Sequence, residues 1–123
     1  MNALAALSQY GKMKDDTQTM YASPHQLMLM LFDGAIEAMS FNIGAIQQND
    51  FEARSKQNTR SIAIINGMRE CLDMKVGGEL AANLYALYQY MAKELFRANF
   101  NNDADTIQNI QTMLKDIRGS WEK

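Results

Sequence analysis

Cysteine, histidine and proline each occur only once in this chain of 123 residues, as Cys71, His25 and Pro24. A lone cysteine cannot form an internal disulfide, so nothing in the sequence marks an oxidising compartment. A lone histidine excludes a multi-histidine zinc site and a di-iron bundle built on paired Glu-x-x-His motifs. One proline and seven glycines leave little material for a turn-rich all-β fold.

The net charge is small, at −2 with a pI near 5.3. Nucleic acid is therefore not expected as the main partner, because phosphate binding needs concentrated Lys and Arg. The longest unbroken apolar run outside the N-terminus, from Leu27 to Phe32, is too short to span a bilayer. Residues 1–7 (MNALAAL) lack a basic region and make a poor signal peptide. We expect a single cytoplasmic domain over residues 1–123, without membrane insertion.

Four helices are predicted from capping signals. The clearest start is at Ser23, which suits an N-cap, with Pro24 at the first helical position and Gln26 closing a capping box. The second helix is expected to start at Asn49 or Asp50. It should end within residues 73–78, where two glycines can adopt positive φ, and residues 99–103 (NFNND) should form the turn before the fourth helix.

Apolar residues recur at three- and four-residue steps within each helix, which predicts one buried stripe per helix. The stripes are Leu27, Leu31, Gly34 or Ala35, Ala38, Phe41 and Ala45; then Ser61, Ile62, Ile65, Met68 and Leu72; then Leu80, Leu84, Leu87, Tyr88, Met91, Leu95 and Ala98; and last Ile107, Ile110, Leu114, Ile117 and Trp121. Short connections predict antiparallel neighbours, hence an all-α, up-down-up-down four-helix bundle over residues 23–123.

Residues 1–22 differ from the bundle. Residues 3–10 suit a short helix with Leu4, Leu7 and Tyr10 on one side, and residues 12–19 are polar and aperiodic. Such a segment can dock on the bundle and detach from it, or it can be a terminal helix packed permanently as core.

No constellation for catalysis or metal binding emerges. His25 sits in a first helical turn without the basic and small residues of a phosphotransfer site. Cys71 is expected to be buried or half-buried, and its acidic neighbours Glu70 and Asp73 raise a thiol pKa. Asp103 and Asp105 resemble the start of a calcium loop, but the later glycine and glutamate are missing, so capping explains them better. We expect neither enzymatic activity nor a cofactor.

With catalysis and metal binding not expected, a surface that binds a partner is the remaining kind of functional site. Methionine is unusually frequent, with ten residues. Met28 and Met30 flank leucines, so the first helix is apolar nearly all round in its first two turns. The N-terminal segment or a partner could cover the extra face, with flexible thioethers adapting to an apolar ligand.

The third helix supplies further candidates. Tyr88 suits the core, whereas Tyr85 and Tyr90 lie off the apolar stripe and suit contact with a partner. Asn83 and Asn99 could hydrogen-bond an extended peptide backbone, or equally cap a helix or face water.

Motifs along almost the whole chain resemble the FliS family of flagellar export chaperones. They are Tyr10, Ala22-Ser23-Pro24-His25-Gln26-Leu27, Met30-Leu31-Phe32-Asp33-Gly34-Ala35, Leu72-Asp73, Gly77-Gly78-Glu79-Leu80-Ala81-x-Asn83-Leu84, Leu87-Tyr88-x-Tyr90-Met91, Ala98-Asn99, Asn102-Asp103 and Trp121. His25 stands where the family often has an aromatic residue.

The resemblance implies a four-helix bundle with a short N-terminal segment, and a function in the cytosol. That function is binding the disordered C-terminal segment of flagellin, which prevents premature polymerisation and helps present the subunit to the export gate protein FlhA. The resemblance assigns Leu7 and Tyr10 to a segment that gates access. Together with the residue patterns, it makes Met28, Met30, Asn83, Tyr90 and Asn99 candidates for lining or edging the flagellin groove.

Other functions stay open at this point. The chain could be a self-associating bundle that hides its apolar first helix in a homodimer. It could also be an adaptor that binds another flagellar export regulator, which the sequence does not separate from flagellin binding.

Overall fold

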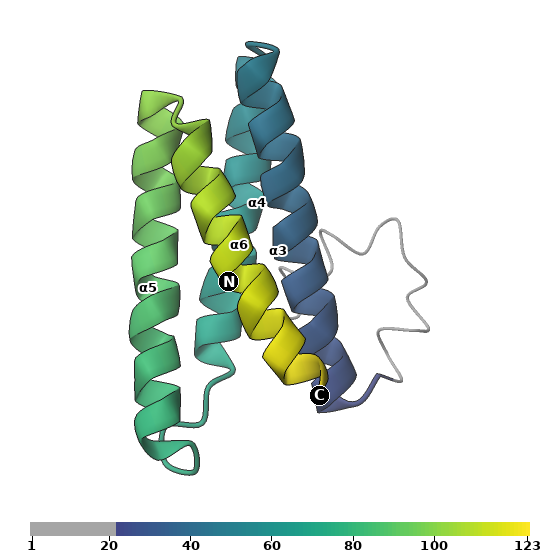
Figure 1. Ribbon diagram of the computed structural model, residues 1–123, viewed down its shortest axis with the longest axis vertical. Helices are drawn as coiled ribbons and strands as arrows, with labels where there is room; N and C mark the ends of the chain where they lie inside the picture. Colours follow the sequence, from purple (N-terminus) through teal and green to yellow (C-terminus); the bar gives the residue numbers. More distant parts are fainter. Residues whose placement is uncertain (1–21) are drawn as a thin grey trace.

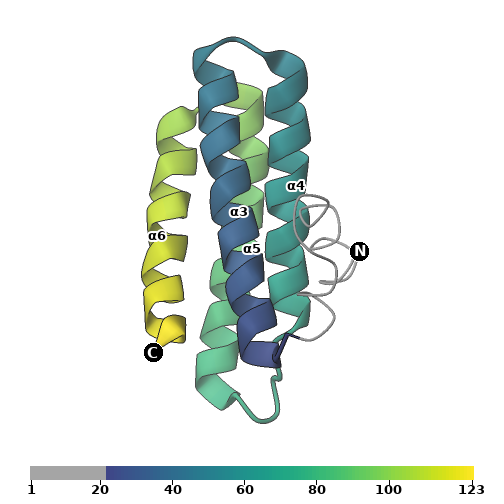
Figure 2. The ribbon, with the colours of Figure 1, turned by 90° about the vertical axis from the view of Figure 1, so that its right-hand side faces the viewer.

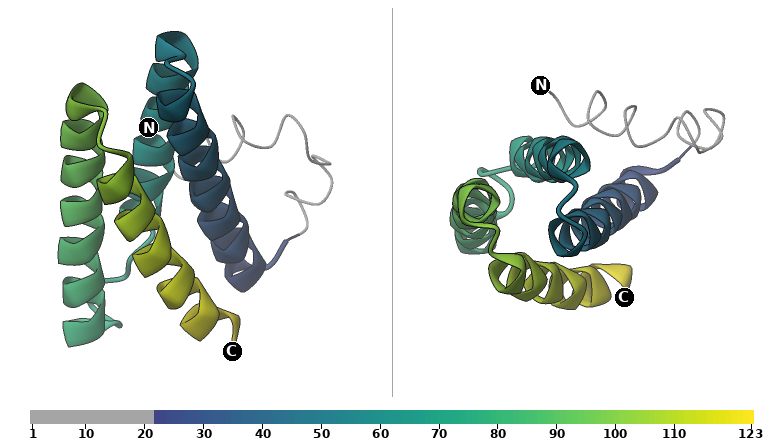
Figure 3. Two further views of the ribbon diagram at one scale, coloured as in Figure 1. Left: turned by 45° about the horizontal axis from the view of Figure 1, so that its top comes forward. Right: turned by 90° about the horizontal axis from the view of Figure 1, so that it is seen from above.

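The computed structural model describes residues 22–123, which form four α-helices and, within that range, no strand. They are α3 (Pro24–Gln47), α4 (Phe51–Glu70), α5 (Gly78–Asn101) and α6 (Ala104–Glu122). Successive helices run antiparallel (Figure 1). Seen from above (Figure 3), they form a ring in chain order, so α3 lies beside α4 and α6 and diagonally across from α5. The all-α, up-down-up-down bundle is confirmed. The N-terminal segment expected over residues 1–22 lies, up to position 21, outside the residues that the structure describes.

Short polar side chains start three of the helices as the sequence predicts. Ser23 Oγ accepts the Gln26 amide at 3.1 Å while Gln26 Oε1 accepts the Ser23 amide at 2.9 Å, so the capping box before α3 is complete. Asp50, rather than Asn49, caps α4, and Asp103 caps α6. Each of these caps satisfies a backbone amide that the first helical turn leaves without a partner.

The two remaining turns differ in detail from expectation. Gly78 has the predicted positive φ of 55°, but Gly77 is the N-cap of α5 with a φ of −76°. A Cβ at Gly77 would lie 2.5 Å from the Cβ of Ala81, so close approach requires glycine there. The turn predicted over residues 99–103 is shorter, because α5 continues to Asn101 and the chain reverses at Asn102 with a φ of 50°. Burial of Ala98 on the last turn of α5 outweighs the weak helix propensity of asparagine.

All four helices contribute to one apolar core. Its buried members are Leu31, Phe32, Ala35, Met39, Ile64, Ile65, Met68, Tyr88, Met91, Leu95, Ala98, Ile107, Ile110 and Leu114. Most of the predicted stripes are therefore in or against the core.

The burial predicted for three stripe members is wrong. Phe41, Leu80 and Trp121 are 51%, 68% and 40% exposed. The buried side of α3 follows Ala38, Asn42 and Ala45, which leaves Phe41 on its rim. Leu80 lies in the first turn of α5 and Trp121 in the last turn of α6, so both are at the end of the bundle, where fewer neighbours cover them.

Two buried polar contacts join neighbouring helices. Asn42 Nδ2 on α3 donates to Asn58 Oδ1 on α4 at 3.0 Å, with both residues buried. Gln111 on α6 donates from Nε2 to the Ile36 carbonyl at 2.9 Å and to Ser40 Oγ at 2.6 Å. Such contacts fix how far one helix slides along the next, because a buried polar group that loses its partner is costly.

Helix α3 is long and apolar enough to cross a membrane, judged by length and composition only. A core helix passes the same test. The burial of large side chains such as Leu31, Phe32 and Met39 between the other helices accounts for its composition.

Candidate functional site

Helix α6 does not lie parallel to α5. It crosses the bundle obliquely, meeting α5 at the Asn102 turn and ending near the start of α3 (Figures 1 and 2). Its packing against α3 is accordingly more extensive than its packing against α5. The inclination exposes side chains that a parallel α6 would cover.

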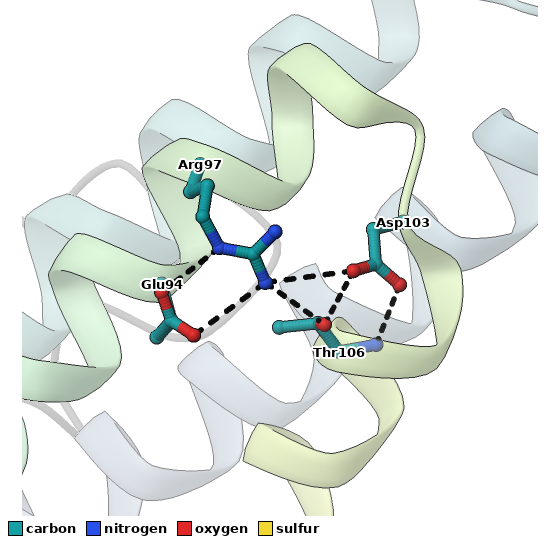
Figure 4. A network of polar contacts seen from close by, with 4 residues as sticks. All are labelled: Glu94, Arg97, Asp103 and Thr106. Carbon is teal, nitrogen blue, oxygen red and sulfur yellow. Dashed lines mark hydrogen bonds and ion pairs between the residues drawn. The ribbon is translucent and has the colours of Figure 1, made fainter.

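A polar network holds α5 and α6 together at the turn (Figure 4). Arg97 on α5 donates to Glu94 Oε2 at 3.0 Å, to Thr106 Oγ1 at 3.2 Å and to Asp103 Oδ2 at 3.5 Å. Hydrogen bonds from the Thr106 hydroxyl and amide, with the charge of Arg97, lower the pKa of Asp103. This network marks which sides of α5 and α6 face one another.

Apolar side chains continue along those facing sides beyond the network. Leu87 and Leu80 precede Glu94 by two and four helical turns, so they share its side of α5. Met113 and Ile117 follow Thr106 by two and three turns on α6. Leu87, Met113 and Ile117 are partly buried against the core, and Leu80 is mostly exposed. We call Leu80, Leu87, Met113 and Ile117 the α5/α6 face.

Two of the predicted binding residues border this face. Asn83 and Tyr90 precede Arg97 by four and two turns, and both are exposed. Since Arg97 reaches α6, Asn83 and Tyr90 lie along the same edge of α5. A polar amide and a phenol therefore lie beside an apolar surface, an arrangement suited to an amphipathic peptide.

Asn99 lies on a different side of α5. Tyr85, four turns earlier on the same side, has the Arg69 guanidinium of α4 5.3 Å from its ring centroid, so this side faces α4. Asn99 Oδ1 is buried and accepts no hydrogen bond. The structure thus separates Asn99 from Asn83 and Tyr90.

Met28 and Met30 are partly buried on α3, packed against the core. Two residues apart on a helix, they point to different sides, and α3 lies diagonally across from α5. A partner touching these methionines and Tyr90 would have to follow the outside of the bundle across more than one helix. Leu7 and Tyr10 lie outside the described residues.

The surroundings of Cys71 differ from those that the sequence predicts. Cys71 is exposed at the C-cap of α4, which corrects the expectation of a buried or half-buried residue. The chain has left the helix there and no neighbouring element covers the thiol fully. Partial desolvation and the charge of Glu70 raise the pKa of this thiol, which disfavours the nucleophilic thiolate. Within residues 22–123, His, Cys, Asp and Glu side chains form no group that could hold a metal ion.

The sequence did not single out the α5/α6 face as a surface. Leu87 and Ile117 fit core periodicity, and Met113 has no feature in the sequence that sets it apart from the other methionines. Their partial burial depends on how α6 packs against α5, which the local pattern does not encode.

A protein-family model described as "Flagellar protein FliS" matches residues 6–123. The chain belongs to the FliS family. It is 37% identical to the flagellar secretion chaperone FliS of Salmonella typhimurium, over 100% of this chain and 92% of that protein. It is 34% identical to the flagellar secretion chaperone FliSB of Pseudomonas aeruginosa, over 99% of this chain and 97% of that protein. For the flagellar secretion chaperone FliS of Vibrio cholerae, the identity is 32% over 96% and 87% of the two chains.

Membership of the FliS family confirms the resemblance found in the motifs. Relatives named flagellar secretion chaperones support a role for this FliS-family chain as a flagellar export chaperone. Such a role implies a flagellar client protein, and the α5/α6 face is a surface on which a client could dock.

Proposed function

We propose that this chain binds the C-terminal segment of flagellin in the cytosol, prevents its premature polymerisation and helps deliver it to the flagellar type III export gate, where FlhA receives it. The chain acts by binding, without catalysis and without a cofactor. The observation that carries the proposal is the FliS family match over residues 6–123, on a bundle that leaves apolar side chains of α5 and α6 exposed.

The chemistry of the α5/α6 face suits this client. A flagellin segment that packs in the filament has apolar faces made for neighbouring subunits, and in water these faces favour self-association. Leu80 and Leu87 offer apolar area to cover such a face, and Asn83 and Tyr90 offer hydrogen-bonding groups at its border. Because the client must fold as it binds, part of the interaction energy is spent on ordering, which limits affinity and allows release.

The other predicted residues take secondary parts in the proposal. Met28 and Met30 would contact a client that extends around the bundle, and Asn99 would do so only after its buried carbonyl becomes accessible. Leu7 and Tyr10 would belong to a segment that competes with flagellin for the bundle.

Titration calorimetry with the full chain tests the proposal. The ligand is a peptide covering the last ~40 residues of flagellin, long enough for two or three helices. One-to-one binding with a large negative heat-capacity change is expected, because apolar surface is buried. A peptide of the same composition in scrambled order is the matched control. Absence of binding by a folded, helical chain would overturn flagellin as the client and favour another export regulator.

Self-association is the second candidate function, and the exposed apolar side chains favour it too. Leu80, Phe96 and Phe100 are 68%, 59% and 73% exposed, which a homodimer could cover. Light scattering separates the two functions. A mass that rises to the dimer with concentration supports self-association, and a constant monomer mass excludes it.

A further inference from the structure

Polar contacts tie α6 to α3 along much of its length. Gln111 contacts Ile36 and Ser40 near the middle of the bundle. Two and three turns later, Arg118 contacts Asp33 and Trp121 contacts His25, both in the N-terminal half of α3. The polar contacts joining α6 to α5 in the described chain are those of Arg97 at the turn. The two ends of α6 are therefore held by different neighbours.

The ion pair at the α3 end is a two-pronged contact. Arg118 Nε lies 2.6 Å from Asp33 Oδ1, and Nη2 lies 3.4 Å from Asp33 Oδ2. Arg118 also pairs with Glu122 one turn later on α6. These contacts, led by the hydrogen bond to Asp33, raise the pKa of Arg118. A planar guanidinium held by a carboxylate in this way fixes direction as well as distance.

Trp121 adds an aromatic contact one turn beyond the ion pair. Its ring stacks on His25, with centroids 5.5 Å apart and planes 12° apart. The indole Nε1 donates to the His25 backbone carbonyl at 3.2 Å. We call Asp33, Arg118, Trp121 and His25 the clasp.

The clasp has a geometric consequence for α5. A helix is a stiff rod, and α6 is held against α5 at Asp103 and against α3 at Arg118. Its C-terminal half therefore cannot lie along the N-terminal half of α5. That is the half of α5 where Leu80 and Leu87 belong to the α5/α6 face, so no part of α6 covers Leu87 fully.

We propose that the clasp holds α6 away from α5 and so keeps the α5/α6 face accessible, which makes Asp33, Arg118 and Trp121 positioning residues for client binding. This inference rests on the proposed function, because it assumes a client that docks on that face. Once the clasp is released, burial of Leu87 against Ile117, which lies level with it in an antiparallel pair, draws α6 toward α5. The face is then occupied by the chain itself, and the client must compete for it.

A distance measurement between α5 and α6 tests the first step. Spin labels are attached at Ala82→Cys and Ser120→Cys, two exposed positions, in a Cys71→Ser background. Pulsed electron resonance should show a shift of the distance distribution to shorter values in Asp33→Ala and in Arg118→Ala. The charge-swapped pair Asp33→Arg/Arg118→Asp should restore the original distance. Glu52→Ala, an exposed acid outside the clasp, is the matched control.

Client affinity tests the second step, with the flagellin peptide defined above and unlabelled chains. Asp33→Ala and Arg118→Ala should weaken binding about 5- to 10-fold, as for other coupled sites, and the charge swap should recover it. A structural role alone would lower thermal stability without this recovery of affinity and distance.

The outcomes separate cleanly. Unchanged or longer distances in Asp33→Ala overturn the proposal that the clasp positions α6. A loss of affinity without a change in distance also overturns it, because it would place Asp33 in direct contact with the client. A shorter distance with unchanged affinity overturns its role in binding. If the reference chain does not bind the peptide, the proposed function itself fails, and the distances still report whether the clasp positions α6.

Discussion

Tyr88 is the most polar large side chain in the apolar core. It is 3% exposed on α5, and burial raises its pKa to about 12. The sequence predicts this position because Tyr88 shares the apolar stripe of its helix with Met91 and Leu95. Burial favours the neutral phenol over the phenolate, so the fold and the proton on Tyr88 are linked.

This linkage predicts a loss of stability in alkali. An unfolded tyrosine ionises near pH 10, whereas folded Tyr88 keeps its proton to about pH 12. Its contribution is therefore full below about pH 10 and is lost as the pH rises through the folded pKa. Urea unfolding at a series of pH values should show a steeper fall for the reference chain than for Tyr88→Phe. Equal slopes would contradict the account; Tyr90→Phe, at an exposed tyrosine, controls for loss of a hydroxyl.

The buried Asn42–Asn58 contact gives a second prediction. Asn42→Ala removes the donor to Asn58 Oδ1 in a site without water access, which should cost roughly 1–3 kcal/mol of unfolding free energy. Replacing both residues with leucine should cost less than the single change, since no polar group is left without a partner. Chemical denaturation measures both. Asn109→Ala, at an exposed position on α6, should change little, and a double variant that costs more than the single change would refute the argument.

At the scale of the element, a structural feature can be predicted from the sequence when the residues that cause it are close together in the chain. Ser23 and Asp103 cap helices through residues three positions away, so their roles can be predicted from the sequence. The inclination of α6 across the bundle cannot, because its cause is not local in the sequence. That inclination depends on Arg118 and Asp33, which are 85 positions apart.

The same reasoning applies to the candidate site. Asn83 and Tyr90 are seven residues apart, so helical geometry alone places them on one side of α5. The separation of Asn99 from them is also a matter of helical phase, but its orientation toward α4 depends on packing between α4 and α5. Periodicity shows which residues share a side of a helix, and tertiary contacts decide which sides are covered.

The start of α6 carries an acid-sensitive prediction. Hydrogen bonds from Thr106 lower the pKa of Asp103, so the contribution of this cap is full above the unfolded pKa of about 3.9 and is lost as the pH falls through the folded pKa. The unfolding free energy of the reference chain should therefore fall more on acidification than that of Asp103→Asn, whose side chain does not ionise. Thr106→Val, which removes the hydroxyl donor, should lie between them. Identical acid profiles for the three chains would rule out this linkage.

For the whole molecule, the bundle combines a buried core with an incompletely covered side. The inclined α6 covers α3 more than α5, so apolar side chains of two helices remain available at one face. A chaperone that must release its client gains from such a surface, because the chain stays folded whether or not the face is occupied. The proposed binding and the fold therefore have one origin, the placement of α6.

The most direct test of this account compares flagellin-peptide affinity between two variants by titration calorimetry. Leu80→Ser removes an exposed leucine from the α5/α6 face, and Phe51→Ser removes a comparably exposed phenylalanine from α4. Both should leave the helical signal and thermal midpoint unchanged. Leu80→Ser should weaken binding about 10-fold or more, as expected for losing a leucine buried on binding, with Phe51→Ser within about 2-fold of the reference. Unchanged affinity in Leu80→Ser would contradict the account and place the client on another face of the bundle.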